Sequence, residues 1–284
     1  MTERLADIVT HIQNVRQLEA VVTAMRGIAA SRAQKGRSQR PAVEAYTDVI
    51  SYAIGQALTL LPENVTAPPS DRKGKRGVIL FCAEQGFAGA FSEHVFEAAG
   101  DISDTTSFVI GTRGSVVAGE RGVTPTWSTA MPTHVEAIPA FANRVADALY
   151  SHVIVGATTE IDLVYSRSLP GGGLHVDRHS LLPIDFGRFT RPVESQPPLT
   201  TLPPAYLLEQ LTAEYVFAQI CEAAMHAFES ENEARMMAMA SAKSNIGTKL
   251  ATLQQRERQL RQEEITTEIV ELAAGTEALT EHRR

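Results

Sequence analysis

The chain has 284 residues with a formal net charge of −7, and 44% of the residues are hydrophobic but only 6% aromatic. This length accommodates one or two domains, and the shortage of aromatic residues favours helices over a β-sandwich or β-barrel. The acidic balance argues against general nucleic-acid binding. The sequence contains no run of about 18 apolar residues, which is the length that a membrane-spanning helix needs. Cys82 and Cys221 lie in apolar surroundings without a Cys-x-x-Cys spacing, which favours neither a disulfide framework nor a zinc site.

The first predicted element is a helix over residues 1–60 with one narrow apolar stripe. Its apolar residues are spaced three and four apart, which is the pattern of a seam for a partner helix; they are Leu5, Ile8, Ile12, Val15, Leu18, Val22, Met25 and Ala29. Pro41 lacks an amide hydrogen and clashes with the preceding turn, so we expect the helix to bend or break near Gln39 and Arg40. The helical pattern then resumes and ends before Pro62.

Basic residues gather in two places in this part of the chain. The first group is Arg26, Arg32, Lys35, Arg37 and Arg40, and the second is Arg72, Lys73, Lys75 and Arg76. Such groups are typical of solvated faces and linkers. The alternative is an electrostatic contact with an acidic surface of a partner protein.

The middle of the chain, residues 76–187, alternates short apolar runs with helical patterns. The runs at 78–82, 108–110 and 161–166 suit buried strands, and helices are expected from about residue 90, at 115–121 and at 138–150. This order predicts a small, Rossmann-like α/β domain.

A glycine-containing loop, residues 84–89, follows the first of these strands and precedes a helix, where a phosphate cradle would lie. The loop lacks the Gly-Lys-Ser/Thr of a P-loop and a complete Gly-x-Gly-x-x-Gly, and Glu84 would repel an anion. The sequence therefore favours a tight strand-to-helix turn over a nucleotide site.

His175, Asp177 and His179 alternate along a predicted strand, so their side chains would share one face. These residue types suit zinc, although no fourth ligand is indicated nearby. The same alternation is typical of a solvent-facing strand edge, and both interpretations stay open at this stage.

The last predicted element is a helix over residues 203–280 that begins after two prolines and contains none. At 1.5 Å per residue its length is on the order of 110 Å, whereas a compact chain of 284 residues has a radius of gyration of roughly 19 Å. The seam residues of the two terminal helices predict that these helices pair as a coiled coil. So long a rod needs another protein around it.

Four segments in these helices carry a resemblance to a known family. Residues 230–239 read Ser-Glu-Asn-Glu-Ala-Arg-Met-Met-Ala-Met, and residues 261–269 read Arg-Gln-Glu-Glu-Ile-Thr-Thr-Glu-Ile. Residues 22–25 read Val-Thr-Ala-Met, and residues 28–31 read Ile-Ala-Ala-Ser. Together they resemble the signature segments of the gamma subunit of F-type ATP synthases. The sequence departs from the family pattern in the loop at 84–89, at Thr23 and at the charged pair Glu263 and Glu264. With these departures the chain resembles a divergent, alternate bacterial type of the gamma subunit.

The resemblance implies a non-catalytic rotor shaft that needs no cofactor. The terminal helices would form an antiparallel coiled coil inside a ring of alpha and beta subunits, and the α/β domain would form a foot on the membrane c-ring beside an epsilon-type subunit. It places the chain at the cytoplasmic face of the bacterial plasma membrane as a peripheral subunit that binds no nucleic acid. The coupling ion, proton or sodium, stays open.

The resemblance also implies which residues contact partners. Arg261 and Gln262 match a pair that engages a loop of beta, Thr266 and Glu268 match positions coupled to the first helix near Met25, and the basic section at 26–40 would face an acidic lever of beta. The implied contact residues are Met25, Arg26, Arg32, Lys35, Arg235, Arg261, Gln262, Thr266 and Glu268. The alternatives are a free coiled-coil scaffold and, with less support, a nucleotide- or metal-binding α/β enzyme.

Overall fold

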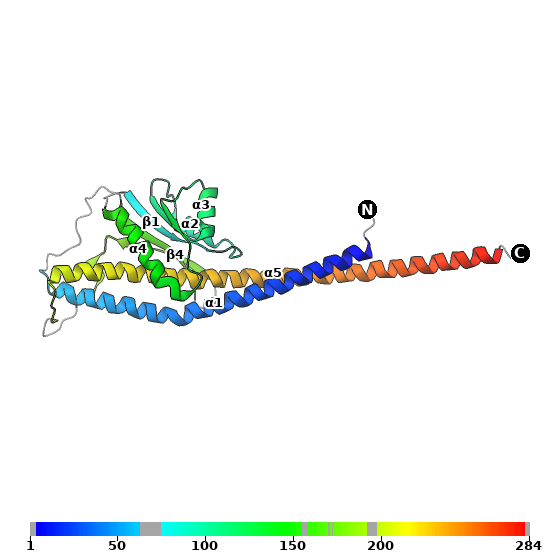
Figure 1. The fold of residues 1–284 in the computed structure, drawn as a ribbon, viewed down its shortest axis with the longest axis horizontal. Helices are drawn as coiled ribbons and strands as arrows, with labels where there is room; N and C mark the ends of the chain where they lie inside the picture. Colours follow the sequence, from blue (N-terminus) through cyan, green and yellow to red (C-terminus); the bar gives the residue numbers. More distant parts are fainter. Residues whose placement is uncertain are drawn as a thin grey trace. The chain divides into compact units, whose positions relative to one another are not determined.

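A computed structural model describes residues 4–62, 75–154, 158–169, 171, 173–191 and 198–281, with only the backbone described from residue 275 onward. It has two compact units. One is formed by Met1–Ile28 and Met237–Arg284, and the other by Ala29–Met236. Two long helices, α1 (Leu5–Thr59) and α5 (Pro204–Glu281), each belong to both units (Figure 1).

The smaller unit is an antiparallel helix pair. Ile8 and Ile12 are buried against Leu253, and Val22 is buried against Met239 and Ile246. Because low residue numbers on α1 meet high numbers on α5, the two helices run in opposite directions. The pairing agrees with the predicted seam, with one correction: Leu18 is 52% exposed. It lies one position before the line through residues 12, 15, 19 and 22, and one residue is a rotation of about 100° on a helix.

The predicted bend or break of α1 at Pro41 is wrong in its stronger form, because the helix continues unbroken from Leu5 to Thr59. A proline removes one backbone hydrogen bond. Val43 and Ile50, which follow it, pack against the main core, and the buried Ala29 and Ala33 precede it. Packing on both sides of Pro41 holds the helix together across the missing bond.

Helix α5 begins at Pro204, where a proline fits because the first turn needs no amide donor. Its 78 residues give a length of about 117 Å. All side chains from residue 261 to residue 274 are exposed. They include four large apolar residues, Ile265, Ile269, Val270 and Leu272, which are 50–71% exposed. None of the described helices is both long enough and apolar enough to cross a membrane.

The larger unit contains a five-stranded sheet in the order β3-β2-β1-β4-β5. The strands are β1 (Lys75–Phe81), β2 (Thr106–Ile110), β3 (Trp127–Thr129), β4 (Thr158–Ser168) and β5 (Leu174–Leu182). The first four are parallel, and β5 runs antiparallel to β4. The sequence did not predict β3, since a partly exposed strand of three residues carries no apolar run.

Helices cover both faces of this sheet, as Figure 1 shows. On one face, Val78 and Leu80 of β1 pack with α2 (Phe91–Ala99) and α3 (Thr112–Glu120). On the other, Ile79 and Phe81 pack with α4 (Ile138–Ile154), α1 and α5. Side chains alternate between faces along a strand, so a continuous apolar run produces two cores. Short 3-10 turns at Val135–Ala137 and Phe186–Arg188 complete the described elements.

The approach of α3 to β1 generates the first prediction. A Cβ atom on Gly114 would lie 2.3 Å from Cβ of Cys82, so Gly114→Ala should destabilise the larger unit by about 1–3 kcal/mol. Gly119 lies in the same helix with no atom within 4 Å of its Cβ position. Gly119→Ala should therefore stabilise by about 0.5–1 kcal/mol. Urea unfolding of the two variants measures both values, and equal effects would contradict the close packing.

Candidate functional site

Nine consecutive residues of α5, from 227 to 235, are buried. Consecutive residues point in all directions around a helix, so this stretch must be covered on every side. Four of the nine are charged, namely Glu229, Glu231, Glu233 and Arg235, and none of them is more than 7% exposed. With their partners they form what we call the joint, which consists of Arg37, Arg40, Gln85, Gly86, Glu229, Glu231, Asn232, Glu233 and Arg235.

One side of the joint faces α1. The Glu229 carboxylate is 1% exposed and accepts hydrogen bonds from Nε of Arg37 at 3.2 Å and from Nη1 of Arg40 at 3.0 Å. Arg37 also forms an ion pair with Glu233. Charge-assisted bonds of this kind compensate for the loss of water around a buried carboxylate. The two arginines are 51% and 28% exposed, so they bring the positive charge in from the surface.

Gly36 allows the two helices to approach at this point. A Cβ atom there would lie 3.3 Å from Cβ of Glu229 and 3.3 Å from a ring carbon of Phe228. Contacts this short require the neighbours to shift. The absence of a side chain therefore brings the α1 backbone close to α5 where Arg37 and Arg40 reach across.

The other side of the joint faces the loop after β1. Arg235 donates to the backbone carbonyl of Gln85 at 3.1 Å and to that of Gly86 at 3.2 Å. It also donates to the Asn232 side chain at 3.1 Å and forms an ion pair with Glu231. The backbone amide of Gln85 in turn donates to the Glu231 carboxylate at 3.2 Å. The N–H groups of the Arg235 guanidinium thus donate to partners within the same chain.

The joint occupies the position where ligands bind in many α/β folds. The chain first adds β2 and β3 on one side of β1 and then places β4 on the other, so the order reverses between β1 and β4. Ligands typically bind outside the carboxyl ends of the strands at such a point. Here the Ser230 hydroxyl donates to the Ser166 carbonyl near the end of β4 at 2.9 Å, and Arg235 holds the loop after β1. Helix α5 itself fills the crevice.

Glu84, the first residue of the loop that follows β1, is bonded within the chain. Its carboxylate accepts hydrogen bonds from the amide of Thr112 at 3.0 Å, the hydroxyl of Thr112 at 2.7 Å and the amide of Met131 at 2.7 Å. This internal anion therefore takes donors at the start of α3, the helix after the one that the loop precedes. This arrangement matches the tight turn that the sequence favoured.

His175, Asp177 and His179 lie on β5 but do not converge on one point. Asp177 pairs with Arg167 at 2.5 Å and with His175 at 3.3 Å, whereas the His179 ring packs on Tyr165 with 5.6 Å between centroids. Within the described residues, no group of three or more histidine, cysteine, aspartate or glutamate side chains is placed to hold a metal ion. The metal hypothesis gains no support from this geometry.

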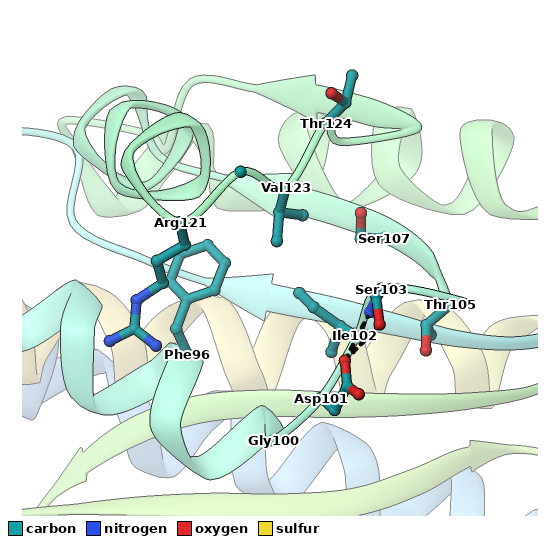
Figure 2. A pocket seen from close by; sticks show the side chains of 11 residues that line it. Phe96, Gly100, Asp101, Ile102, Ser103, Thr105, Ser107, Arg121, Val123 and Thr124 are labelled. Atoms are coloured by element: carbon teal, nitrogen blue, oxygen red, sulfur yellow. Dashed lines mark hydrogen bonds between the residues drawn. The ribbon is translucent and has the colours of Figure 1, made fainter.

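A hollow of about 610 Å³ lies at the amino ends of β2 and β3 (Figure 2). Its polar lining is mainly hydroxyl groups, including those of Ser103, Ser107 and Thr124. The charged groups at its rim already have partners: Asp101 accepts from Ser103, and the Arg121 guanidinium lies over the Phe96 ring at 5.5 Å. The hollow lies at the amino ends of the strands, whereas the joint lies at their carboxyl ends, where the strand order reverses between β1 and β4. The residues that line the hollow do not form a set of catalytic groups.

The predicted contact residues fall into separate places. On α1, Arg26 is exposed, Arg32 is half-buried, and neither makes a salt bridge with any part of the chain that the structure describes. Lys35 pairs with Glu136, and Met25 packs with the cluster of Val22, Met239 and Ile246. The four predicted contact residues in the distal part of α5 are all exposed; they are Arg261, Gln262, Thr266 and Glu268.

Two of the implied pairings differ from the structure. Thr266 lies 16 residues beyond Leu250, which packs in the same cluster as Met25, and this is about 24 Å along the helix axis. Thr266 and Glu268 therefore do not contact Met25 within this chain. Arg235 is buried in the joint and bonded internally. Of the second basic group, Arg72 and Lys73 lie outside the described residues, and Arg76 lies 3.5 Å from Glu160.

The sequence prediction missed the acidic half of the joint. Residues 229, 231 and 233 are alternating glutamates between buried alanines at 227 and 234. On a helix, residues two apart point to opposite sides, so alternating charges within an otherwise buried stretch are a signal that both sides are covered by polar partners. Gly36 next to Arg37, inside a long helix, is the matching signal on α1.

The sequence model of the ATP synthase family matches residues 4–279. The chain belongs to the ATP synthase family. It is 26% identical to the ATP synthase gamma chain of Parafrankia sp., with 98% of this chain and 99% of that relative covered. It is 28% identical to the gamma chain of Trichormus variabilis, with 97% and 99% covered. The resemblance found in the sequence is thus confirmed.

A solved structure agrees in fold with this member of the ATP synthase family. A chain in the Euglena gracilis mitochondrial ATP synthase, OSCP/F1/c-ring, in rotational state 3 matches with a TM-score of 0.65 at 12% identity. The match covers 99% of this chain and 96% of that one. The predicted fold class, an antiparallel coiled coil with a small α/β domain, is confirmed.

Next to the joint, His226 of α5 lies in a buried aromatic and charged environment. Its ring stacks on Tyr165 with centroids 5.7 Å apart, and Nε2 lies 4.0 Å from Glu44. Burial, followed by the positive charges of Arg40 and Arg167, lowers the pKa of His226 to about 4, although Asp177 acts in the opposite direction. Burial also lowers the pKa of His179 and raises that of Glu222.

The neutral state of His226 predicts a pH dependence of stability. The unfolded chain takes up a proton on this residue below about pH 6.5, while the folded chain resists it until about pH 4. Stability should therefore fall as the pH falls through this window, by up to about 3 kcal/mol from this group. The raised pKa of Glu222 has the opposite effect on stability as the pH falls. The contribution of His226 is therefore isolated by comparing the natural chain with His226→Phe, in which an aromatic ring still stacks on Tyr165. Urea unfolding at pH 7 and pH 4.5 should show a smaller loss for the variant, and an equal loss would contradict the assignment.

The close helix approach at Gly36 gives a second prediction for this site. Gly36→Val should separate α1 from α5 at the joint and destabilise the isolated chain by about 1–3 kcal/mol. Gly27→Val in the same helix is the control, because no atom lies within 4 Å of its Cβ position. Thermal unfolding should show a clearly lower Tm for the first variant alone. Similar Tm values would show that the approach is not tight.

Proposed function

We propose that this chain is the gamma subunit of an F-type ATP synthase, a rotor shaft that couples ion flow through a membrane ring to ATP synthesis or hydrolysis in an alpha/beta ring. The chain itself is a non-catalytic subunit. The observation that carries the proposal is the distal part of α5, residues 261–274, where an extended helix has every side chain exposed. Membership of the ATP synthase family supports this proposal, because a complex with other subunits would cover such a helix.

A helical segment exposed in this way gains no stability from packing within the chain. Isolated helices shorter than about 15 residues are marginal in water, and most helical stability in proteins comes from packing. Ile265, Ile269 and Leu272 are spaced four and three apart, so they form an apolar stripe on one face. Such a stripe needs a partner surface, which is what a sleeve of surrounding subunits would provide.

The α1 helix of the smaller unit adds a second uncovered stripe. Leu18, Val21 and Ile28 are 52–55% exposed and lie on the side of α1 that does not pack on α5. A free two-helix scaffold would cover these residues by self-association. The family assembly would cover them with alpha and beta subunits instead.

The proposal includes partners and contact residues. Alpha and beta subunits would surround the smaller unit, and an epsilon-type subunit and the c-ring would bind the larger one. The proposed contacts are Met25, Arg26, Arg32, Lys35, Arg261, Gln262, Thr266 and Glu268, which the structure leaves exposed or partly exposed. We place Arg235 inside the joint instead. The complex would lie at the cytoplasmic face of a bacterial plasma membrane and use protons or sodium ions.

The coupling mechanism follows from asymmetry. A single helix pair presents different side chains in different directions, so three surrounding beta subunits cannot contact the same surface at once. Each rotational position would favour a different conformation of each beta subunit by the difference in contact free energy. Rotation and catalysis elsewhere in the complex are thereby linked without a reactive group on this chain.

The test is co-expression with alpha and beta subunits from the same source, followed by native mass spectrometry. We expect one copy of this chain with three alpha and three beta subunits, and a higher ATPase activity than the ring alone. Replacing Ile265 and Ile269 by aspartate should reduce the yield of this complex at least about tenfold, because two charges would be buried in the sleeve.

The matched control is the double variant Glu263→Gln and Glu264→Gln, which changes exposed residues of the same helix turn without adding buried charge. It should assemble like the natural chain. A chain that remains apart from alpha and beta, as a monomer or a self-paired rod, would refute the rotor function and favour the scaffold.

A further inference from the structure

Helix α5 contacts the sheet in two chemically different ways. One contact is apolar, and α5 contributes to it small side chains such as Ala223 and Ala224 together with larger ones such as Ile220, Met225 and Phe228. Apolar attraction is not directional. This contact resists separation of the helix from the sheet, but the attraction itself has no direction that would select one rotational position of the helix.

The second contact is the joint, where the bonds are directional. Glu229 and Glu233 are four residues apart and face α1, while Glu231 and Arg235 are four residues apart and face the loop after β1. Residues 229 and 231 are separated by about 200° around the helix. The two pairs therefore hold α5 from opposite sides, and a rotation of α5 would break bonds on both.

The loop held by Arg235 is itself tied to the rest of the sheet. Glu84, the residue before Gln85, bonds to Thr112 after β2 and to Met131 after β3. On the other side of β1, Ser230 bonds to Ser166 of β4. A force on α5 is thus distributed to the carboxyl ends of four neighbouring strands.

We propose that Arg235 and Glu231 are positioning residues that fix the rotational register of α5 against the sheet and so transmit torque between the helices and the α/β domain. This inference rests on the proposed rotor function. Buried ion pairs contribute little net stability compared with apolar replacements, but in some proteins they select one register over others. Arg235 and Glu231 have 6% and 5% of their side chains exposed, so their bonds are shielded from competing water and salt.

The experiment uses membrane vesicles that carry the complete ATP synthase with this chain. ATP hydrolysis and ATP-driven ion uptake are measured in the same vesicles, and their ratio reports how much rotation reaches the membrane ring. For Arg235→Met we expect the ions moved per ATP to fall about threefold or more, because α5 can turn without carrying the sheet. Arg235→Lys keeps the charge and one or two of the hydrogen bonds. Its ratio of ions moved per ATP should therefore lie between that of the natural chain and that of Arg235→Met.

Arg144→Met is the matched control. Arg144 is an exposed residue of α4 that lies over the Phe141 ring, away from the joint, and its loss removes the same guanidinium without touching α5. Its ratio should equal that of the natural chain. A general loss of stability would lower the amount of intact complex on the vesicles, whereas slippage lowers the ions moved per ATP at an unchanged amount of intact complex.

The outcomes separate this inference from the function on which it rests. If the natural chain is absent from the complex, the rotor function fails. If the natural chain assembles and Arg235→Met keeps the natural ratio, the function stands and the torque role of the joint is refuted. Glu231→Gln, which keeps the size of the side chain, is the second variant. If neither variant can be recovered in the complex, the joint serves folding or assembly and the torque role is also refuted.

Discussion

The removal of four charged side chains from water within two turns of α5 constrains the rest of the larger unit. An unpaired carboxylate in such a position would cost several kcal/mol, so each of the three glutamates requires a cation or several donors in place. Arg37 and Arg40 of α1 supply one set, and Arg235 with the Gln85 amide supplies the other. The helix pairing, the path of the loop after β1 and the position of β4 must all be compatible with these bonds.

The same requirement accounts for the absence of ligand chemistry at the switch point of the sheet. An α/β domain normally leaves the carboxyl ends of its strands open to a substrate or cofactor. In this chain Glu84 satisfies the donors at the start of α3, and α5 covers the crevice between β1 and β4. A position that binds a ligand in other proteins has become a connection between two parts of one chain.

The parts of this structure that depend on local pattern could be predicted, and those that depend on distant partners could not. Apolar spacing predicted both long helices and the strands at 78–82, 108–110 and 161–166, because burial on one or two faces leaves a period in the sequence. It failed for Leu18, which is apolar but lies off the seam, and for β3, which is too short to have a period. The joint was invisible in part because a buried glutamate and a solvated one look the same until the arginine that pairs with it is located 192 residues away.

The uncovered end of α5 has a consequence for the life of the chain in a cell. The side chains of residues 261–274 are all exposed and contribute no buried packing, so local unfolding there costs little free energy. Proteases act on segments that open easily, and an unassembled copy presents such a segment with exposed Ile265 and Leu272. An unassembled copy would therefore be cleaved within residues 261–274 before it is cleaved in its folded core, and assembly that covers this helix would protect it.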